Sequence, residues 1–243
     1  MYADVHAHLD DKWFAEDIDD VIKRAENAGV KAIIQNGLNQ KTNEKSIELS
    51  KKYKIIKPAL GIYPSETGKD IDAVCDFIKK HKKIVCAIGE VGLDKTYENF
   101  DKQKGIFSRM ISLAKELNKP ISVHSRKAEK ETIEQLESEG AKKVHLHCFM
   151  GNLEIAKKAI KLGYSFSIPC TIIKGSHFQE LVKLVPLKQL LTETDSPYLG
   201  VERGKRNEPA NIPQIVEKIA EIKGLELEDA KNILFMNYQQ LFG

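Results

Sequence analysis

The sequence lacks the long apolar runs of a membrane protein. No stretch approaches the ~18 consecutive apolar residues that a spanning helix needs. Charged and polar residues (Asp4, His6, His8 and Asp10) stand where a secretory signal would have its apolar core. We therefore expect a protein of the cytoplasm that makes no membrane contact.

Cysteine is scarce and never paired in a CxxC motif. The four residues stand singly in apolar stretches, which is typical of reduced, buried thiols and argues against a disulfide framework or a zinc-cysteine cluster. They are Cys75, Cys86, Cys148 and Cys170.

An excess of charge of one sign is also missing. The 38 Lys and Arg residues nearly balance the 35 Asp and Glu residues, which leaves a formal net charge of +3. This excludes a protein that coats nucleic acid, but not an enzyme that grips one end of a strand. With 42% hydrophobic residues the 243-residue chain can build a sizeable core, so disorder is excluded too.

What recurs along the chain is a short β-branched run followed by a charged segment of helical period, such as Phe107-Met110-Ile111-Ala114. Eight such units in about 240 residues predict an α/β protein, a closed (β/α)8 TIM barrel forming a single domain over residues 1–243. The rival, an open doubly wound sheet, lacks its glycine-rich fingerprint, because His-Ala-His follows Val5. The predicted strands are Tyr2–His6, Lys31–Gln35, Ile55–Leu60, Ile84–Gly89, Ile121–His124, Val144–His147, Tyr164–Ile168 and Gln189–Glu193.

Imidazole and carboxylate side chains stand at the C-terminal ends of these runs, where a barrel places its functional site. Strand side chains alternate, so His6 and His8 face the same side. The set suits divalent ions such as Zn, Mn, Ni, Co or Mg, and it exceeds what one tetrahedral ion needs, so we favour two ions with Glu90 bridging them. The six predicted ligands are His6, His8, Glu90, His124, His147 and Asp195.

Each residue taken alone has an ordinary structural interpretation. A buried histidine is more often a hydrogen-bonded core residue, Asp195 before Ser-Pro suits a turn, and Glu90 could pair with a lysine. The convergence of all six at one end of successive strands favours the metal site. His145 should lie one layer deeper as a core or supporting residue, and His81 and His177 should lie at the surface.

With these motifs the chain resembles the TatD family of metal-dependent hydrolases over its whole length. The resemblance implies a (β/α)8 barrel with two metal positions, one held by His6, His8, Glu90 and Asp195, the other by Glu90, His124 and His147. It also implies a deoxyribonuclease, often one that trims strands from the 3′ end. The matching motifs are Asp4-x-His6-x-His8, Gly89-Glu90-Val91-Gly92-Leu93-Asp94, Pro120-Ile121-x-x-His124-Ser125-Arg126, His147-Cys148-Phe149-x-Gly151 and Glu193-Thr194-Asp195-Ser196-Pro197-Tyr198-Leu199, with Arg203-Gly204 and Asn207-Glu208-Pro209 downstream.

Two departures from the family pattern lie in loops on the substrate side. Tyr63-Pro64 stands where the family usually has His-Pro, and Lys95-Thr96-Tyr97 stands where it often has a Tyr-Tyr-Arg run. They bear on substrate preference rather than on metal chemistry.

The resulting hypothesis is hydrolysis of a phosphodiester, with DNA as the substrate, by a water that two divalent ions activate. Asp195 would act as base, Glu90 as bridge, and Arg126 would hold a phosphate oxygen or, alternatively, pair with a barrel carboxylate. Arg203, Lys205 and Arg206 form a basic loop that would meet the nucleic-acid backbone or remain solvated. The sequence leaves the oligomeric state undetermined.

Two other functions remain open. The same two-metal barrel can hydrolyse amides, lactones or esters, although Glu90 stands where many such enzymes carry a modified lysine. A non-catalytic binding subunit of a nuclease complex is the second alternative, and the complete ligand set argues against it.

Overall fold

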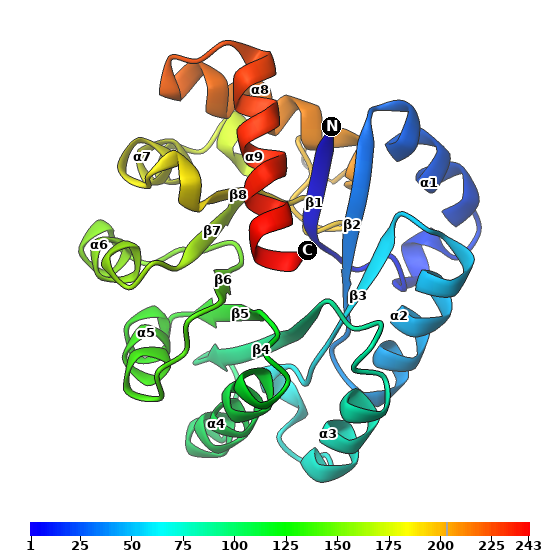
Figure 1. The fold of residues 1–243 in the computed structure, drawn as a ribbon, viewed down its shortest axis with the longest axis vertical. Helices are drawn as coiled ribbons and strands as arrows, with labels where there is room; N and C mark the ends of the chain where they lie inside the picture. The colour runs from blue at the N-terminus through cyan, green and yellow to red at the C-terminus, as the bar shows by residue number, and fades with distance from the viewer. Residues whose placement is uncertain (203) are drawn as a thin grey trace.

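Eight parallel strands follow one another around a closed sheet in the order of the sequence, as Figure 1 shows. This computed structural model describes residues 1–202 and 204–243. All eight predicted strands are present, and the (β/α)8 prediction is confirmed. The strands are β1 (Tyr2–Ala7), β2 (Val30–Asn36), β3 (Ile56–Leu60), β4 (Ala87–Asp94), β5 (Ile121–Arg126), β6 (Val144–Leu146), β7 (Ser165–Ile168) and β8 (Leu190–Thr192).

The ring closes between β8 and β1. The Thr192 hydroxyl donates to the Ala3 carbonyl at 2.7 Å. Just beyond β8, the Asp195 backbone N–H donates to the His6 carbonyl at 2.8 Å, and the His8 N–H donates to the Ser196 carbonyl at 2.8 Å. The contact that closes the barrel therefore also joins two predicted site segments.

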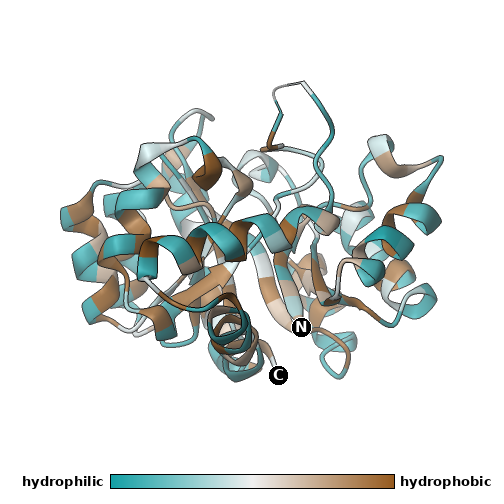
Figure 2. Cartoon of the chain, turned by 90° about the horizontal axis from the view of Figure 1, so that it is seen from above, coloured by the Kyte–Doolittle hydropathy of each residue, from teal (hydrophilic) through white to brown (hydrophobic). Residues whose placement is uncertain are grey.

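Helices follow the strands and cover the outside of the barrel. Figure 2 shows hydrophilic and hydrophobic residues interspersed along these helices. In the first helix, Val21, Ile22 and Ala25 are buried while Lys23 is exposed, as a helical period of 3.6 requires. The helices are α1 (Ile18–Asn27), α2 (Gln40–Lys52), α3 (Ile71–Lys80), α4 (Phe100–Glu116), α5 (Glu129–Ser138), α6 (Leu153–Lys161), α7 (Ser176–Leu184), α8 (Ile212–Lys223) and α9 (Leu227–Phe242), with single 3-10 turns η1 (Lys12–Phe14), η2 (Pro64–Glu66), η3 (Cys170–Ile173), η4 (Leu187–Gln189) and η5 (Pro209–Asn211).

The fourth strand departs most from its predicted bounds. It runs through Glu90 to Asp94 instead of ending at Gly89, and residues 84–86 precede it. Gly92 in the added part of the strand permits close packing, because a Cβ at this position, whose φ is +144°, would lie 2.0 Å from the His124 carbonyl oxygen. Glu90 therefore projects from within a strand, and its backbone N–H donates to the Gly37 carbonyl at 3.0 Å.

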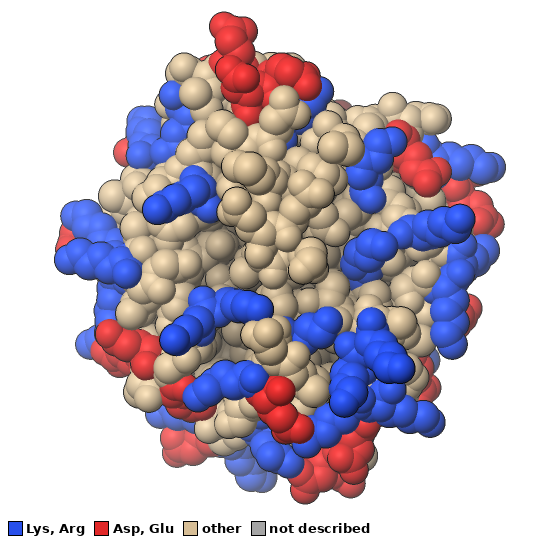
Figure 3. Space-filling view, viewed as in Figure 1, with Lys and Arg blue, Asp and Glu red and all other residues tan. Residues whose placement is uncertain are grey.

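The other end of the barrel is sealed by α9. Phe242 forms an apolar cluster inside the barrel with Val5, Ile34 and Leu191, among others. Figure 3 shows this face, with few charged side chains over its centre and Lys and Arg side chains around it. Among the described helices, none combines the length and apolar content that crossing a membrane requires. The four cysteines are free thiols.

Candidate metal centre

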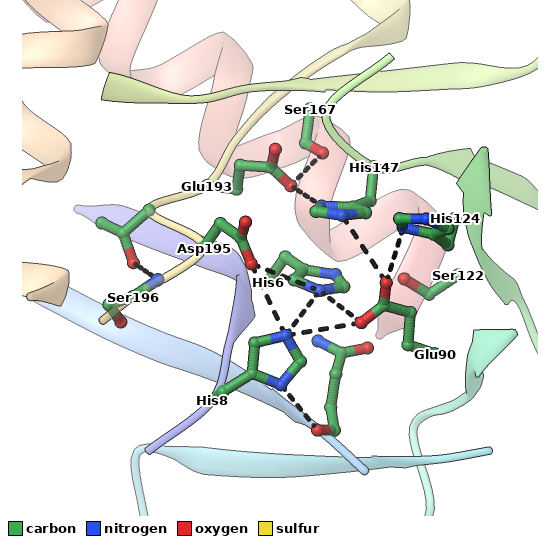
Figure 4. Close-up of polar contacts among 12 residues, drawn as sticks. His6, His8, Glu90, Ser122, His124, His147, Ser167, Glu193, Asp195 and Ser196 are labelled. Carbon is green, nitrogen blue, oxygen red and sulfur yellow. Dashed lines mark hydrogen bonds and ion pairs between the residues drawn. The ribbon is translucent and has the colours of Figure 1, made fainter. Parts of the chain in front are cut away.

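Five strands of the barrel bring the six predicted ligands to its C-terminal end (Figure 4). Three lie within strands, His6 in β1, Glu90 in β4 and His124 in β5. His8 and His147 follow directly after β1 and β6, and Asp195 is the third residue after the end of β8. The structure thus places all six residues in one cluster.

Glu90 lies at the centre, and its two carboxylate oxygens face different histidines. Oε2 lies 3.2 Å from His6 Nε2 and 3.4 Å from His8 Nε2. Oε1 lies 3.0 Å from His124 Nδ1 and 3.7 Å from His147 Nε2. The carboxylate therefore divides the imidazoles into two pairs, one at each oxygen.

Asp195 completes the first group. Its Oδ1 lies 3.5 Å from His8 Nε2 and 3.9 Å from His6 Nε2. The residue has a left-handed backbone with φ of +54°, which the hydrogen bond from its N–H to the His6 carbonyl holds in place. Its side chain is 16% exposed, against 8% for His8 and less for the other four, so it is the ligand most open to solvent.

Three of the four histidines present one nitrogen to Glu90 and have the other nitrogen held from behind, whereas His6 Nδ1 is buried and has no hydrogen-bond partner among the described residues. His124 Nε2 lies 3.1 Å from Asp94 Oδ2, and His147 Nδ1 lies 3.0 Å from Glu193 Oε2. His8 Nδ1 faces a backbone carbonyl at 3.1 Å. Metal-binding histidines in proteins have this arrangement, because the outer partner fixes the tautomer and the ring orientation.

His145 lies below this layer, fully buried, as a supporting residue. Its Nδ1 is 3.0 Å from the Ser122 hydroxyl, and its Nε2 is 2.6 Å from the Ser167 hydroxyl. Ser167 in turn donates to Glu193 Oε2 at 2.6 Å, so hydrogen bonds connect the barrel interior to His147. His81 and His177 lie outside this cluster, partly buried, with hydrogen bonds to backbone carbonyls.

The carboxylates of the cluster attract positive charge. Burial alone would raise the pKa of Glu90, but the His6 charge and hydrogen bonds from the surrounding imidazoles place it well below its ordinary value. Burial alone would lower the pKa of His147, but Glu193 raises it to about 9. Burial leaves the pKa of His145 well below its ordinary value.

The donor set fits divalent cations. Two groups of three residues each offer ligand atoms that lie within 4.8 Å of one another. One group is His6, Glu90 and His147, and the other is His6, His8 and Asp195. Imidazole and carboxylate donors suit Zn, Mn, Co or Ni, and a cation between them would supply the positive charge that the carboxylates attract.

A cavity of about 390 Å³ opens above the cluster. Arg126 is exposed on its wall, and within the described residues its guanidinium makes no ion pair, so the predicted alternative of a barrel carboxylate partner is not observed. The Tyr63 hydroxyl lies 3.2 Å from His124 Nε2, and burial near Glu90 raises the pKa of this phenol. The cavity is lined by His8, Leu38, Tyr63, Glu90, Tyr97, His124, Arg126, His147, Asp195, Tyr198 and Leu199.

The predicted basic loop is largely committed to internal contacts. Arg206 makes two 2.7 Å hydrogen bonds to the carboxylate of Asp17, at the start of α1. Lys205 pairs with Glu202 at 2.6 Å, and Arg203 lies outside the described residues. Arg206 is therefore a structural ion-pair partner and not a free cation for a nucleic-acid backbone.

The prediction from sequence assigned no role to Asp94 and Glu193. Both stand in the strand-end motifs that it used, four residues after Glu90 and two before Asp195. A carboxylate repeated within such a motif was the available signal. Only the packing of neighbouring strands shows which carboxylate faces the centre and which supports a histidine.

Comparison with known proteins finds relatives that match nearly the whole chain. The profile of the family described as "TatD related DNase" matches residues 3–243. The human deoxyribonuclease TATDN3 is 40% identical over 98% of this chain and 93% of its own length, and the 3'-5' ssDNA/RNA exonuclease TatD of Shigella flexneri is 30% identical over 99% and 98%. The crystal structure of a TatD homolog from Escherichia coli superposes with a TM-score of 0.92 at 26% identity, covering 99% of this chain and 97% of that one.

Proposed function

The chain belongs to the TatD-related DNase family, and from this membership we propose that it is a divalent-metal-dependent deoxyribonuclease that removes nucleotides from strand ends. The relatives include proteins named as a deoxyribonuclease and as a 3'-5' exonuclease for single-stranded DNA and RNA. The observation that carries the proposal is the division of the Glu90 carboxylate between two pairs of imidazoles.

We assign one cation to each side of that carboxylate. His6, His8 and Asp195 would complete the first position, and His124 and His147 the second. Two ions bridged by a carboxylate are a common arrangement for cleaving phosphodiesters, because both the attacking and the leaving oxygen require stabilisation.

The protein's own groups then have separate tasks. A bound divalent ion lowers the pKa of water from 15.7 towards roughly 7. Asp195, the most exposed of the six residues, accepts the proton of the attacking water. Arg126 on the cavity wall donates to a phosphate oxygen and positions the scissile bond.

Metal removal tests the proposal. Purified protein is stripped with a chelator and assayed on single-stranded DNA, then reloaded with Mg, Mn, Co or Zn. We expect stripping to abolish cleavage and at least one ion to restore it. Full activity in metal-free buffer, or none with any ion, would contradict the proposal.

Asp195→Asn should keep the fold and lose most turnover, and a wild-type rate would remove Asp195 as the base.

The amide, lactone and ester hydrolases remain the alternative class. A parallel assay of DNA and a small lactone under the same metal conditions separates the two, because each class predicts turnover of one substrate and not the other.

A further inference from the structure

The aromatic side chains that the described structure leaves most exposed all lie around the mouth of the catalytic cavity. Trp13 is 51% exposed, Tyr97 44% and Tyr198 53%. They follow β1, β4 and β8 respectively, at the same end of the barrel as Glu90. Single exposed apolar residues need no explanation, but three aromatic rings gathered at one site indicate a binding surface.

Polar contacts hold the Trp13 backbone and the Tyr198 side chain in place. The Trp13 backbone N–H donates to Asp11 Oδ1 at 2.9 Å, and the Trp13 carbonyl accepts from Arg206. The Tyr198 hydroxyl donates to the other oxygen of Asp11 at 3.0 Å. The fold thus fixes the backbone that carries Trp13 and the position of the Tyr198 ring, which lowers the entropy cost of binding a ligand there.

The rings lie on two sides of the cavity. Tyr97 is on its wall, where its ring meets the Tyr63 ring edge-on with centroids 6.0 Å apart. On the other side, Tyr198 and Leu199 line both the catalytic cavity and a neighbouring, mostly apolar pocket of about 580 Å³. Trp13 is part of the wall of that second pocket. The two hollows therefore adjoin, with Tyr198 and Leu199 as their shared wall.

We propose, building on the proposed function, that Tyr97 on one side and the pocket between Trp13 and Tyr198 on the other bind the two bases that flank the scissile phosphate. A base presents a flat face on which an aromatic ring stacks, and such contacts are insensitive to sequence. Two neighbouring bases of a strand that are held apart on two sides of a cavity cannot both remain paired with a complementary strand. The substrate is then a strand end whose bases are unpaired on both sides of the cleavage point.

The chain supplies its own probe, because Trp13 is its only tryptophan. Full-length protein in chelator, which prevents cleavage, is titrated with short oligothymidylate while tryptophan fluorescence is recorded. We expect quenching by the single strand, and none by an abasic sugar-phosphate chain of equal length or by a blunt duplex. Equal quenching by the abasic chain, or no quenching by the base-bearing strand, would overturn the proposal.

Variants test Tyr97 independently of the tryptophan signal. Fluorescence anisotropy of labelled oligothymidylate should show that Tyr97→Leu weakens binding on the order of 10-fold, because one stacking contact is lost, whereas Tyr97→Phe retains most of the affinity. Met150→Ala is the matched control, since this side chain is 53% exposed after β6 and lines neither hollow. A loss in Met150→Ala equal to that in Tyr97→Leu would contradict the assignment.

Cleavage kinetics separate this inference from the proposed function. If strands with and without their terminal bases are cut with equal kcat/KM, the stacking positions are refuted and the nuclease assignment stands. If a single strand quenches the tryptophan fluorescence in a base-dependent way but the protein does not cut it with any metal, the nuclease assignment is refuted and the stacking positions stand.

Discussion

Glu193 contacts the outer nitrogen of His147, and we expect metal binding by this histidine to depend on that contact. It is fully buried, and its Oε2 accepts from Ser167 and lies 3.0 Å from His147 Nδ1. We expect Glu193→Gln to weaken metal binding on the order of 10- to 100-fold, because the outer carboxylate no longer fixes the imidazole tautomer or raises its basicity. Manganese titration followed by elemental analysis measures the effect.

Glu154→Gln is the control for Glu193, since that side chain is 79% exposed on α6. The control should bind manganese like the wild type. Unchanged affinity in Glu193→Gln, with His147 still in the cluster, would mean that the carboxylate only packs and does not tune the histidine.

Arg126 differs from the other charged residues near the site because its guanidinium is exposed on the cavity wall without a described ion-pair partner. Arg126→Ala should lower kcat/KM for DNA on the order of 10- to 100-fold, mainly through KM, because a charge-assisted hydrogen bond contributes roughly 1.5–3 kcal/mol. Metal content should not change. Lys130→Ala, 71% exposed on α5, controls for simple loss of positive charge. An equal loss in both variants would indicate only general charge attraction.

At the scale of elements, the strands could be predicted because a parallel barrel buries both faces of each strand, and the β-branched runs record that burial. Their ends were less certain. Strand β6 ends at Leu146 and β8 at Thr192, so His147 and Glu193, which the predicted strands included, lie just beyond the observed strands.

The contacts that depend on several elements at once could not be predicted. The role of α9 as the seal of the barrel is one example, because its apolar residues are equally compatible with packing on the outside of the sheet. Exposure of Trp13 is another, since a tryptophan beside Phe14 reads as core until the loop places Phe14 inside and Trp13 outside.

The seal itself can be tested. Phe242 is 8% exposed and meets the His145 ring edge-on with centroids 5.6 Å apart. Phe242→Ala should lower the free energy of unfolding by about 3 kcal/mol, because it leaves a cavity at the closed end of the barrel. Urea unfolding measures it, with Met236→Ala, 46% exposed on the same helix, as the control expected within about 0.5 kcal/mol. Equal urea midpoints for Phe242→Ala and Met236→Ala would show that α9 packs on the barrel without sealing its end.

A second contact between elements, the ion pair of Arg206 with Asp17, joins the segment before α8 to the start of α1. Hydrogen bonds from Arg206 lower the pKa of Asp17 to about 2, from an ordinary 3.8. A carboxylate with a lowered pKa stabilises the fold above its ordinary pKa, and this stabilisation is lost as pH falls from about 4 to about 2. Asp17→Asn should therefore unfold at a lower temperature than the wild type at about pH 6, and the difference should close at about pH 2.

Thermal unfolding over a pH series measures this difference. Asp101→Asn, whose side chain is 99% exposed, should match the wild type throughout. A difference between Asp17→Asn and the wild type that persists unchanged at low pH would assign the effect to packing instead of charge.

At the scale of the whole molecule, the candidate metal centre joins the first and the last strand of the barrel. His6 comes from the first strand and Asp195 from beyond the eighth, with Glu90 between them, so the ligands assemble only in the folded barrel. A cation that binds only the folded state stabilises it by about 2.7 kcal/mol at 100 times its dissociation constant. For a chain of this length, manganese should raise Tm by roughly 5–10 °C. His6→Asn should remove most of this rise, and a wild-type Tm that does not depend on manganese would mean that the cluster does not hold the ion.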